Sequence, residues 1–138
     1  MTPLSHALAR QLIVHLEAAS APQIVFVSGA QGIGKSTALR GALSQLQARA
    51  IGLGLDGFYL PKAERLALAR EVHPLFETRG PPGTYDLKLL IETLTALKTA
   101  APGDRIALPR FSKAADDRLP PEDWDTWTGR PDLIVLEG

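Results

Sequence analysis

The sequence contains no cysteine, which excludes disulfide bridges and thiolate metal sites. Its 15 basic and 15 acidic side chains balance to a formal net charge of zero, and no run of lysine or arginine marks a nucleic-acid surface. No apolar stretch approaches the roughly 20 residues that a membrane-spanning helix needs. We therefore expect neither a nucleic-acid nor a membrane partner, and the lack of cysteine suits a cytoplasmic enzyme.

The composition is otherwise that of an ordinary globular protein, with 45% hydrophobic and 22% charged residues. A chain of 138 residues has room for one core and hardly for two. The N-terminal stretch has no basic leader and repeats leucine at four-residue spacing, so we expect an amphipathic helix capped by Thr2 rather than a signal peptide. The oligomeric state does not follow from the sequence.

The most informative stretch is GAQGIGKS, which fits the pattern G-x-x-x-x-G-K-[ST]. An apolar, β-branched run at 24–27 precedes it and predicts a buried parallel strand, while the residues after it have helical spacing. Backbone N–H groups of such a loop can point inward, and the helix start adds partial positive charge. We therefore predict a phosphate-binding loop made of Gly29, Ala30, Gln31, Gly32, Ile33, Gly34, Lys35, Ser36 and Thr37.

Strands and helices alternate along the chain. Hydrophobic spacing predicts strands at 23–28, 50–55, 105–109 and 133–136, and helices at 35–48, 62–71 and 86–99. This alternation implies βαβ units, so the expected fold class is α/β, a three-layer P-loop NTPase fold with a mostly parallel sheet. Residues 73–84 form a loop that is either ordered or mobile, and residues 112–131 look irregular, with two tryptophans as packing anchors.

Two carboxylates follow predicted strands. Asp56 stands at the carboxyl end of the second strand, where open α/β sheets bind ligands, and can take the proton of an acceptor hydroxyl that attacks the γ-phosphorus. The alternative for Asp56 is a cap on the following turn. Glu137 ends the last apolar strand, where a carboxylate can hold Mg²⁺ or orient the Ser36 hydroxyl, or it is a chance acidic residue.

Several basic and aromatic residues are candidates for binding an anionic acceptor, because an arginine fork matches a carboxylate. Each of them lies in a loop or at a strand end, so a surface or packing role is an equal alternative. The acceptor-binding candidates are Tyr59, Arg79, Arg110 and Lys113, with His73, Tyr85 and Arg118 as further possibilities.

With these residues laid out, the chain resembles the P-loop small-molecule kinases, the group of uridine kinase, phosphoribulokinase, pantothenate kinase and D-glycerate 3-kinase. Three features carry the resemblance: GAQGIGKS, DGFY at 56–59 and LIVLEG at 133–138. Within the group the chain most resembles D-glycerate 3-kinase and its relatives. The supporting stretches are LDGFYLP at 55–61, HPLFETRGPPGTYDL at 73–87 and LPRFSKAADDR at 108–118.

The resemblance implies that Lys35 and Ser36 bind the phosphates of ATP and Mg²⁺, that Asp56 is the general base and that Glu137 is the acidic Walker-B-type residue. It implies transfer of the γ-phosphate of ATP to a hydroxyl of a small acceptor, first of all D-glycerate. The chain departs from its relatives where it has Gly57 and Ser112 in place of aspartates, which leaves the acceptor open.

The group's lid and adenine-contacting segment follow the position of Gly138. We therefore expect residues 1–138 to be the N-terminal portion of a single kinase domain. Three alternatives stay open. The first is a uridine- or pantothenate-kinase-like enzyme, since a nucleoside would stack on an aromatic such as Phe58 or Tyr59. The second is a hydrolysing switch NTPase, which needs no base at Asp56. The third is a non-catalytic nucleotide-binding protein.

Overall fold

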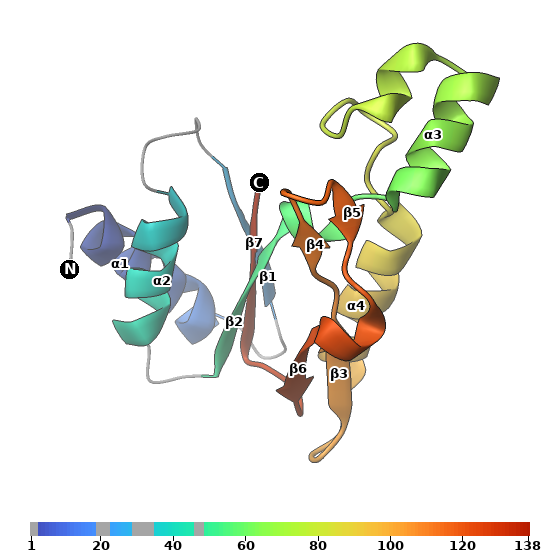
Figure 1. Cartoon of the computed structure of the whole chain (residues 1–138). Helices are drawn as coiled ribbons and strands as arrows, with labels where there is room; N and C mark the ends of the chain where they lie inside the picture. The colour runs from blue at the N-terminus through green and yellow to red at the C-terminus, as the bar shows by residue number, and fades with distance from the viewer. Residues whose placement is uncertain (1–2, 19–22, 29–34, 46–48) are drawn as a thin grey trace. The chain divides into compact units, whose positions relative to one another are not determined.

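A parallel sheet of three strands organises the first of two units into which the chain divides (Figure 1). The computed structural model describes residues 3–18, 23–28, 35–45 and 49–138. Unit 1 comprises Met1–Gly54 and Arg130–Gly138, and unit 2 comprises Leu55–Gly129. In the sequence, unit 2 is therefore one continuous segment that follows one strand of unit 1 and precedes another. That the two units act together as a single kinase domain stays a prediction.

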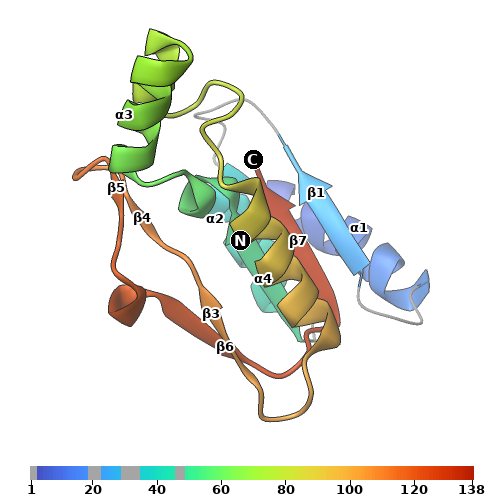
Figure 2. The same cartoon turned by 90° about the vertical axis from the view of Figure 1, so that its right-hand side faces the viewer.

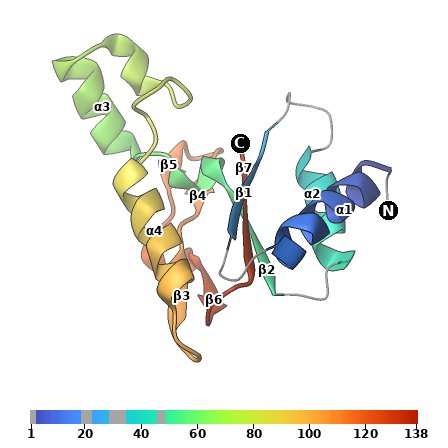
Figure 3. The same cartoon turned by 180° about the vertical axis from the view of Figure 1, so that it is seen from behind.

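In unit 1, strand β7 (Leu133–Glu137) runs between β1 (Gln23–Val27) and β2 (Ala50–Gly54), parallel to both. The first four residues of β7 are buried, as the sequence predicts from its continuous apolar run. Helices α1 (Pro3–Ala18) and α2 (Lys35–Gln45) lie on one side of the sheet (Figure 3). They complete a core of Ala9, Leu12, Leu39, Ala42, Leu133 and Val135.

Strand β1 differs from the buried strand that its sequence predicts. Val25 and Val27 pack against the core, but the side chains of Ile24 and Phe26 are 40% and 55% exposed. Successive side chains of a strand point to opposite faces, and α1 and α2 cover one face of this sheet. The apolar run of β1 is therefore partly buried, at alternate positions.

Unit 2 is described throughout. Its helices are α3 (Lys62–Glu71) and α4 (Leu87–Thr99), and its strands form two antiparallel ribbons (Figure 2). One ribbon pairs β3 (Arg105–Leu108) with β6 (Asp125–Thr128), and the other pairs β4 (Phe111–Ser112) with β5 (Asp117–Arg118). Short 3-10 turns occupy Leu55–Phe58, Pro74–Glu77 and Pro121–Asp123. None of the helices that the structure describes combines the length and hydropathy needed to cross a membrane.

One prediction for this unit is wrong. The segment 112–131 is not irregular, since it contains β5, β6 and a 3-10 turn. The strand predicted at 105–109 is present as β3, and it pairs antiparallel with β6 in a ribbon separate from the parallel sheet. Ile106 stands opposite Trp127 in this ribbon and is buried there. A four-residue polar strand such as β6 has too little apolar alternation to be read from its sequence.

The loop at 73–84 is held by several hydrogen bonds, which favours the ordered one of the two alternatives left open by the sequence. The Thr84 hydroxyl accepts a hydrogen bond from the Gly80 N–H at 3.0 Å and donates one to the Pro81 carbonyl at 2.7 Å. The Thr84 carbonyl accepts the N–H of Leu60 at 2.8 Å, and the Thr84 side chain is fully buried. Gly83 has a φ of +93°, which favours glycine. These contacts fix the loop to the segment after β2.

Candidate active site

The predicted nucleotide residues belong to unit 1. Gly29, Ala30, Gln31, Gly32, Ile33 and Gly34 lie outside the described residues, and Lys35 and Ser36 are described only as the first backbone residues of α2. The strand predicted before these residues and the helix predicted after them are confirmed as β1 and α2. Thr37, the next residue of α2, is exposed.

Glu137 lies at the carboxyl end of β7, in register with Val27 at the end of β1. The N–H of Gly138 donates to the Val27 carbonyl at 3.1 Å, so the two strand ends are held together. The predicted phosphate loop begins two residues after Val27 in the sequence. Glu137 is thus placed at the strand end from which that loop departs, and its carboxylate is the kind of oxygen donor that Mg²⁺ prefers.

Asp56 belongs to unit 2, in the 3-10 turn that follows β2 directly. Its carboxylate oxygen Oδ2 lies 2.7 Å from Nζ of Lys113, which belongs to the turn between β4 and β5. The two side chains are 55% and 62% exposed, so a further ligand can reach both. The structure therefore joins the predicted base to one predicted acceptor-binding residue, whereas the approach of Asp56 to the phosphate loop stays a prediction.

Tyr59 is buried beside this pair. Its ring stacks on that of Tyr85, with centroids 4.6 Å apart, and the two hydroxyl oxygens are 3.2 Å apart. The ring edge of Phe111 completes the aromatic group, at a centroid distance of 5.3 Å from Tyr59. Burial above all, then the Tyr85 hydroxyl and finally Asp56, raise the pKa of Tyr59 well above its ordinary value. Tyr59 is therefore a neutral hydrogen-bonding group next to Asp56 at physiological pH.

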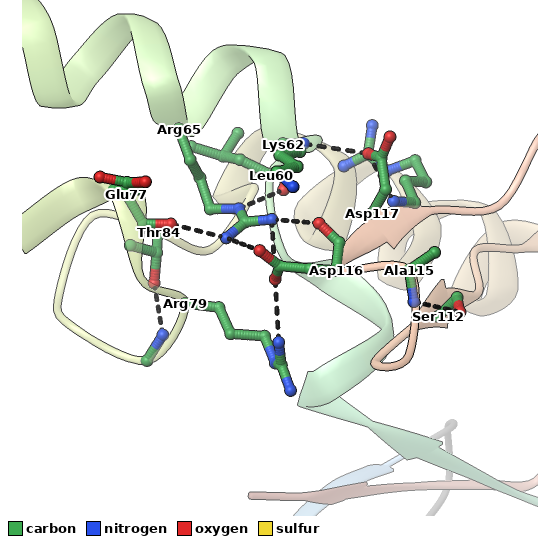
Figure 4. Close-up of polar contacts among 12 residues, drawn as sticks. Leu60, Lys62, Arg65, Glu77, Arg79, Thr84, Ser112, Ala115, Asp116 and Asp117 are labelled. Carbon is green, nitrogen blue, oxygen red and sulfur yellow. Dashed lines mark hydrogen bonds and ion pairs between the residues drawn. The ribbon is translucent and has the colours of Figure 1, made fainter.

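Arg79, another predicted binding residue, contacts Asp116. Its Nη1 atom lies 2.8 Å from Oδ1 of that carboxylate, and Figure 4 shows the Asp116 carboxylate between the guanidinium groups of Arg79 and Arg65. Both guanidinium carbons also lie over the ring of Phe111, at 5.6 Å for Arg65 and 5.8 Å for Arg79. Phe111 thus connects the Arg79 contact to the aromatic group around Tyr59.

Burial would raise the pKa of Asp116, but hydrogen bonds and charges from Arg65 and Arg79 outweigh it and lower that pKa below its ordinary value. Asp116 is therefore ionised at neutral pH and paired with both arginines. Neither Asp116 nor Arg65 is among the candidates named from the sequence. The chain has many carboxylates and arginines, and the residues next to these two give no sign that they pair with each other.

Arg110 is not brought to this group by any contact that the structure describes. Its Nε atom lies 3.8 Å from Asp125, and both side chains are more than half exposed, which makes a weak surface pair. Arg118 contacts Asp86 at 2.8 Å and the Tyr59 carbonyl at 3.1 Å, so it fixes the backbone that carries Tyr59. His73 accepts the N–H of Leu75 and caps the 3-10 turn there.

Gly57 and Ser112, the two positions where the sequence leads us to expect a departure from related kinases, have local roles in the structure. A Cβ atom at Gly57 would lie 2.9 Å from the carbonyl oxygen of Pro109, so this segment leaves no room for a side chain. The Ser112 hydroxyl accepts the N–H of Ala115 at 3.1 Å and helps close the β4–β5 turn.

The parallel sheet, its helices and the strand-end carboxylate define the class: the fold is that of the P-loop kinases, as the sequence predicts. A solved D-glycerate 3-kinase from Cryptococcus neoformans var. grubii matches the whole chain with a TM-score of 0.86 and 27% identity, over 53% of its own length. A possible uridine kinase from Bacillus stearothermophilus matches 96% of the chain with a TM-score of 0.64, and its 18% identity supports the fold alone.

Curated relatives point to the same group. A chloroplastic D-glycerate 3-kinase of Arabidopsis thaliana is 35% identical over 128 residues, which cover 85% of this chain and 28% of the relative. A pantothenate kinase of Shewanella pealeana is 30% identical over 122 residues, covering 85% of this chain and 36% of the relative. No family model matches the chain. The resemblance to small-molecule kinases is thus confirmed, although the chain spans about a third of the length of these curated relatives.

Proposed function

We propose that these 138 residues are part of an ATP-dependent kinase that phosphorylates a hydroxyl of a small carboxylate-bearing metabolite, with D-glycerate as the first candidate. One observation carries the proposal: Asp56, placed after β2 as a base requires, is in direct contact with Lys113. A carboxylate base beside an exposed ammonium group suits an acceptor that presents a hydroxyl to one and an anionic group to the other.

The nucleotide half of the proposal rests on the loop from Gly29 to Ser36 between β1 and α2. Lys35 would bind the β- and γ-phosphates, and Ser36 with Glu137 would hold Mg²⁺. Mg²⁺ in such sites is held by one or two protein ligands together with phosphate oxygens, so a single strand-end carboxylate fits this role. The metal would neutralise the charge that develops on the transferred phosphoryl group.

The acceptor half rests on unit 2. Asp56 would take the proton of the acceptor hydroxyl, and Lys113 and Arg79 would bind the acceptor carboxylate. Tyr59, kept neutral by burial, would lie beside the acceptor and bind it through its hydroxyl. Arg110 would contribute less to acceptor binding, because its described ion pair is with Asp125 and not with a residue of this group.

Pantothenate is the second candidate acceptor, favoured by the pantothenate kinase that matches 85% of the chain. It also bears a carboxylate and a primary hydroxyl, so the same charged groups suit it. Uridine lacks a carboxylate and would leave Arg79 and Lys113 without an anionic ligand. A cytoplasmic location, in keeping with the absence of cysteine, is part of the proposal as well.

A panel of acceptors tests this proposal in the full-length protein. ADP release is measured with ATP, Mg²⁺ and D-glycerate, pantothenate, uridine or glycerol, the last being a hydroxyl compound without a carboxylate. We expect D-glycerate to give the highest kcat/KM and Lys35→Ala to abolish ATP binding or turnover. Turnover of uridine and none of a hydroxy acid would overturn the proposed acceptor class, and ATP binding without turnover of any acceptor would favour a non-catalytic protein.

A further inference from the structure

Two arginines converge on the Asp116 carboxylate, and they differ in how fully their donors are used. Arg65 is completely buried, and its guanidinium donates to the carbonyls of Leu60 at 3.1 Å and Glu77 at 2.9 Å as well as to Asp116. Arg79 is 31% exposed, and Asp116 is the one hydrogen-bond acceptor that contacts its guanidinium among the residues that the structure describes. Arg79 therefore keeps N–H donors for a ligand, whereas Arg65 does not.

We propose that Asp116 is a positioning residue for the acceptor: anchored by the buried Arg65, it orients Arg79 so that the remaining donors of Arg79 bind the acceptor carboxylate. This inference rests on the proposed function and adds a residue that has no contact with the substrate itself. An arginine held on one side by a fixed carboxylate loses less rotamer freedom when it binds a second one.

The arrangement ties Arg79 to the proposed base. The Arg79 guanidinium lies over Phe111, and Phe111 packs edge-on against Tyr59, which lies close to Asp56. The same β4–β5 turn that carries Asp116 also carries Lys113, whose carbonyl accepts the Asp116 N–H at 3.3 Å. This one turn therefore holds both Lys113, which contacts Asp56, and Asp116, which orients Arg79. A hydroxy acid, with its hydroxyl close to its carboxylate, matches such a pairing.

The backbone of Asp116 decides which substitution is informative. Its φ is +54°, a conformation that asparagine and aspartate tolerate far better than alanine does. Asp116→Asn therefore keeps the turn and removes the charge. Asp117→Asn is the matched control, because Asp117 occupies the next position, receives the N–H groups of Lys62 and Arg118, and has no described contact with Arg79.

Steady-state kinetics of the full-length protein tests the inference, with D-glycerate and glycerol as acceptors. We expect Asp116→Asn to raise the KM for D-glycerate by roughly 10- to 100-fold, as for loss of a charge-assisted hydrogen bond, and to leave kcat and the KM for ATP almost unchanged. Glycerol turnover and the Asp117→Asn variant should be unaffected. The double variant Asp116→Asn/Arg79→Gln should be no worse than Arg79→Gln, because Asp116 acts through Arg79.

The outcomes separate the inference from the function on which it rests. A wild-type protein that phosphorylates no carboxylate-bearing acceptor overturns both. If the wild type is active, any of three results overturns the inference alone. These are an unaltered KM in Asp116→Asn, equal losses in Asp116→Asn and Asp117→Asn, and additive effects in the double variant. Should Asp116→Asn fail to fold, Arg79→Lys decides, since lysine keeps the charge but lacks the fork that Asp116 orients. A wild-type KM in Arg79→Lys then overturns the inference.

Discussion

Lys113 Nζ lies 2.7 Å from Oδ2 of Asp56, although the two residues are far apart in the sequence. The sequence assigns them different roles, one as a base and the other as a binding group for an anion. Their contact means that the proposed base has a built-in cation at its side. Since both side chains are more than half exposed, an acceptor that brings its own carboxylate can compete with Asp56 for the ammonium group.

Replacement of the proposed base is the most direct test of the chemistry. Asp56→Asn keeps the shape of the side chain but cannot take a proton, so we expect kcat to fall by roughly 10²–10⁴-fold with ATP affinity nearly intact. Turnover is measured by ADP release and ATP affinity by calorimetry. Asp123→Asn, the same change at an exposed residue of the 3-10 turn Pro121–Asp123, is the control and should behave as wild type. Full turnover in Asp56→Asn would remove the proposed mechanism.

A substitution of Lys113 can distinguish a role in acceptor binding from a role in stability. Because its pair with Asp56 is largely exposed, Lys113→Gln should change the free energy of unfolding by less than about 1 kcal/mol. We expect the KM for D-glycerate to rise by about tenfold, and the salt dependence of that KM to weaken, because one screened charge is lost. Kinetics at low and high salt together with urea unfolding measures both. Lys98→Gln, at the exposed end of α4, is the control, and an equal effect there would contradict a binding role for Lys113.

The parts of the fold that the sequence predicts are those with a strong local cause. Helix α3 has the predicted limits because Pro61 precedes it, and β7 is buried, as its apolar run predicts, because it is the middle strand of the sheet. Strand β3 is predicted, but its partner β6 and the short strands β4 and β5 are missed, because two to four mostly polar residues carry no readable period. The pairing of Asp116 with Arg65 and Arg79 depends on the path of two loops, which local sequence does not determine.

A substitution of Gly57 tests the close approach of the Pro109 carbonyl to this residue. An added Cβ would lie 2.9 Å from a backbone carbonyl oxygen, which cannot turn aside as a flexible side chain can. We therefore expect Gly57→Ala to lower the free energy of unfolding by roughly 1–3 kcal/mol, as overpacking does elsewhere. Gly54→Ala is the control, because among the described atoms nothing lies within 4 Å of its added Cβ. Urea unfolding compares the two, and equal stability in both variants would contradict this contact.

We expect Arg65 to stabilise the fold and not to bind the acceptor. Its buried guanidinium satisfies the carbonyls of Leu60 and Glu77 and the charge of Asp116. Arg65→Met removes all these donors at once and should cost roughly 3–5 kcal/mol, as loss of one partner of a buried ion pair does. Urea unfolding measures the cost. Arg70→Met on the exposed side of α3 is the control and should be nearly neutral, and a similar small effect for Arg65→Met would contradict the anchoring role.

The charge of Asp116 should make stability depend on pH in a defined direction. Its folded-state pKa is lowered below the ordinary value of 3.8, despite burial, by Arg65 and Arg79. A carboxylate with a lowered pKa stabilises the fold above its unfolded-state pKa, and this stabilisation is lost as the pH falls through the folded-state value. We therefore expect the stability difference between wild type and Asp116→Asn to be constant near neutral pH and to shrink below about pH 4. Thermal unfolding across that range measures it, with Asp123→Asn as control. A difference that stays constant into the acid range would show that the Asp116 carboxylate is not held in its ionised form by the two arginines.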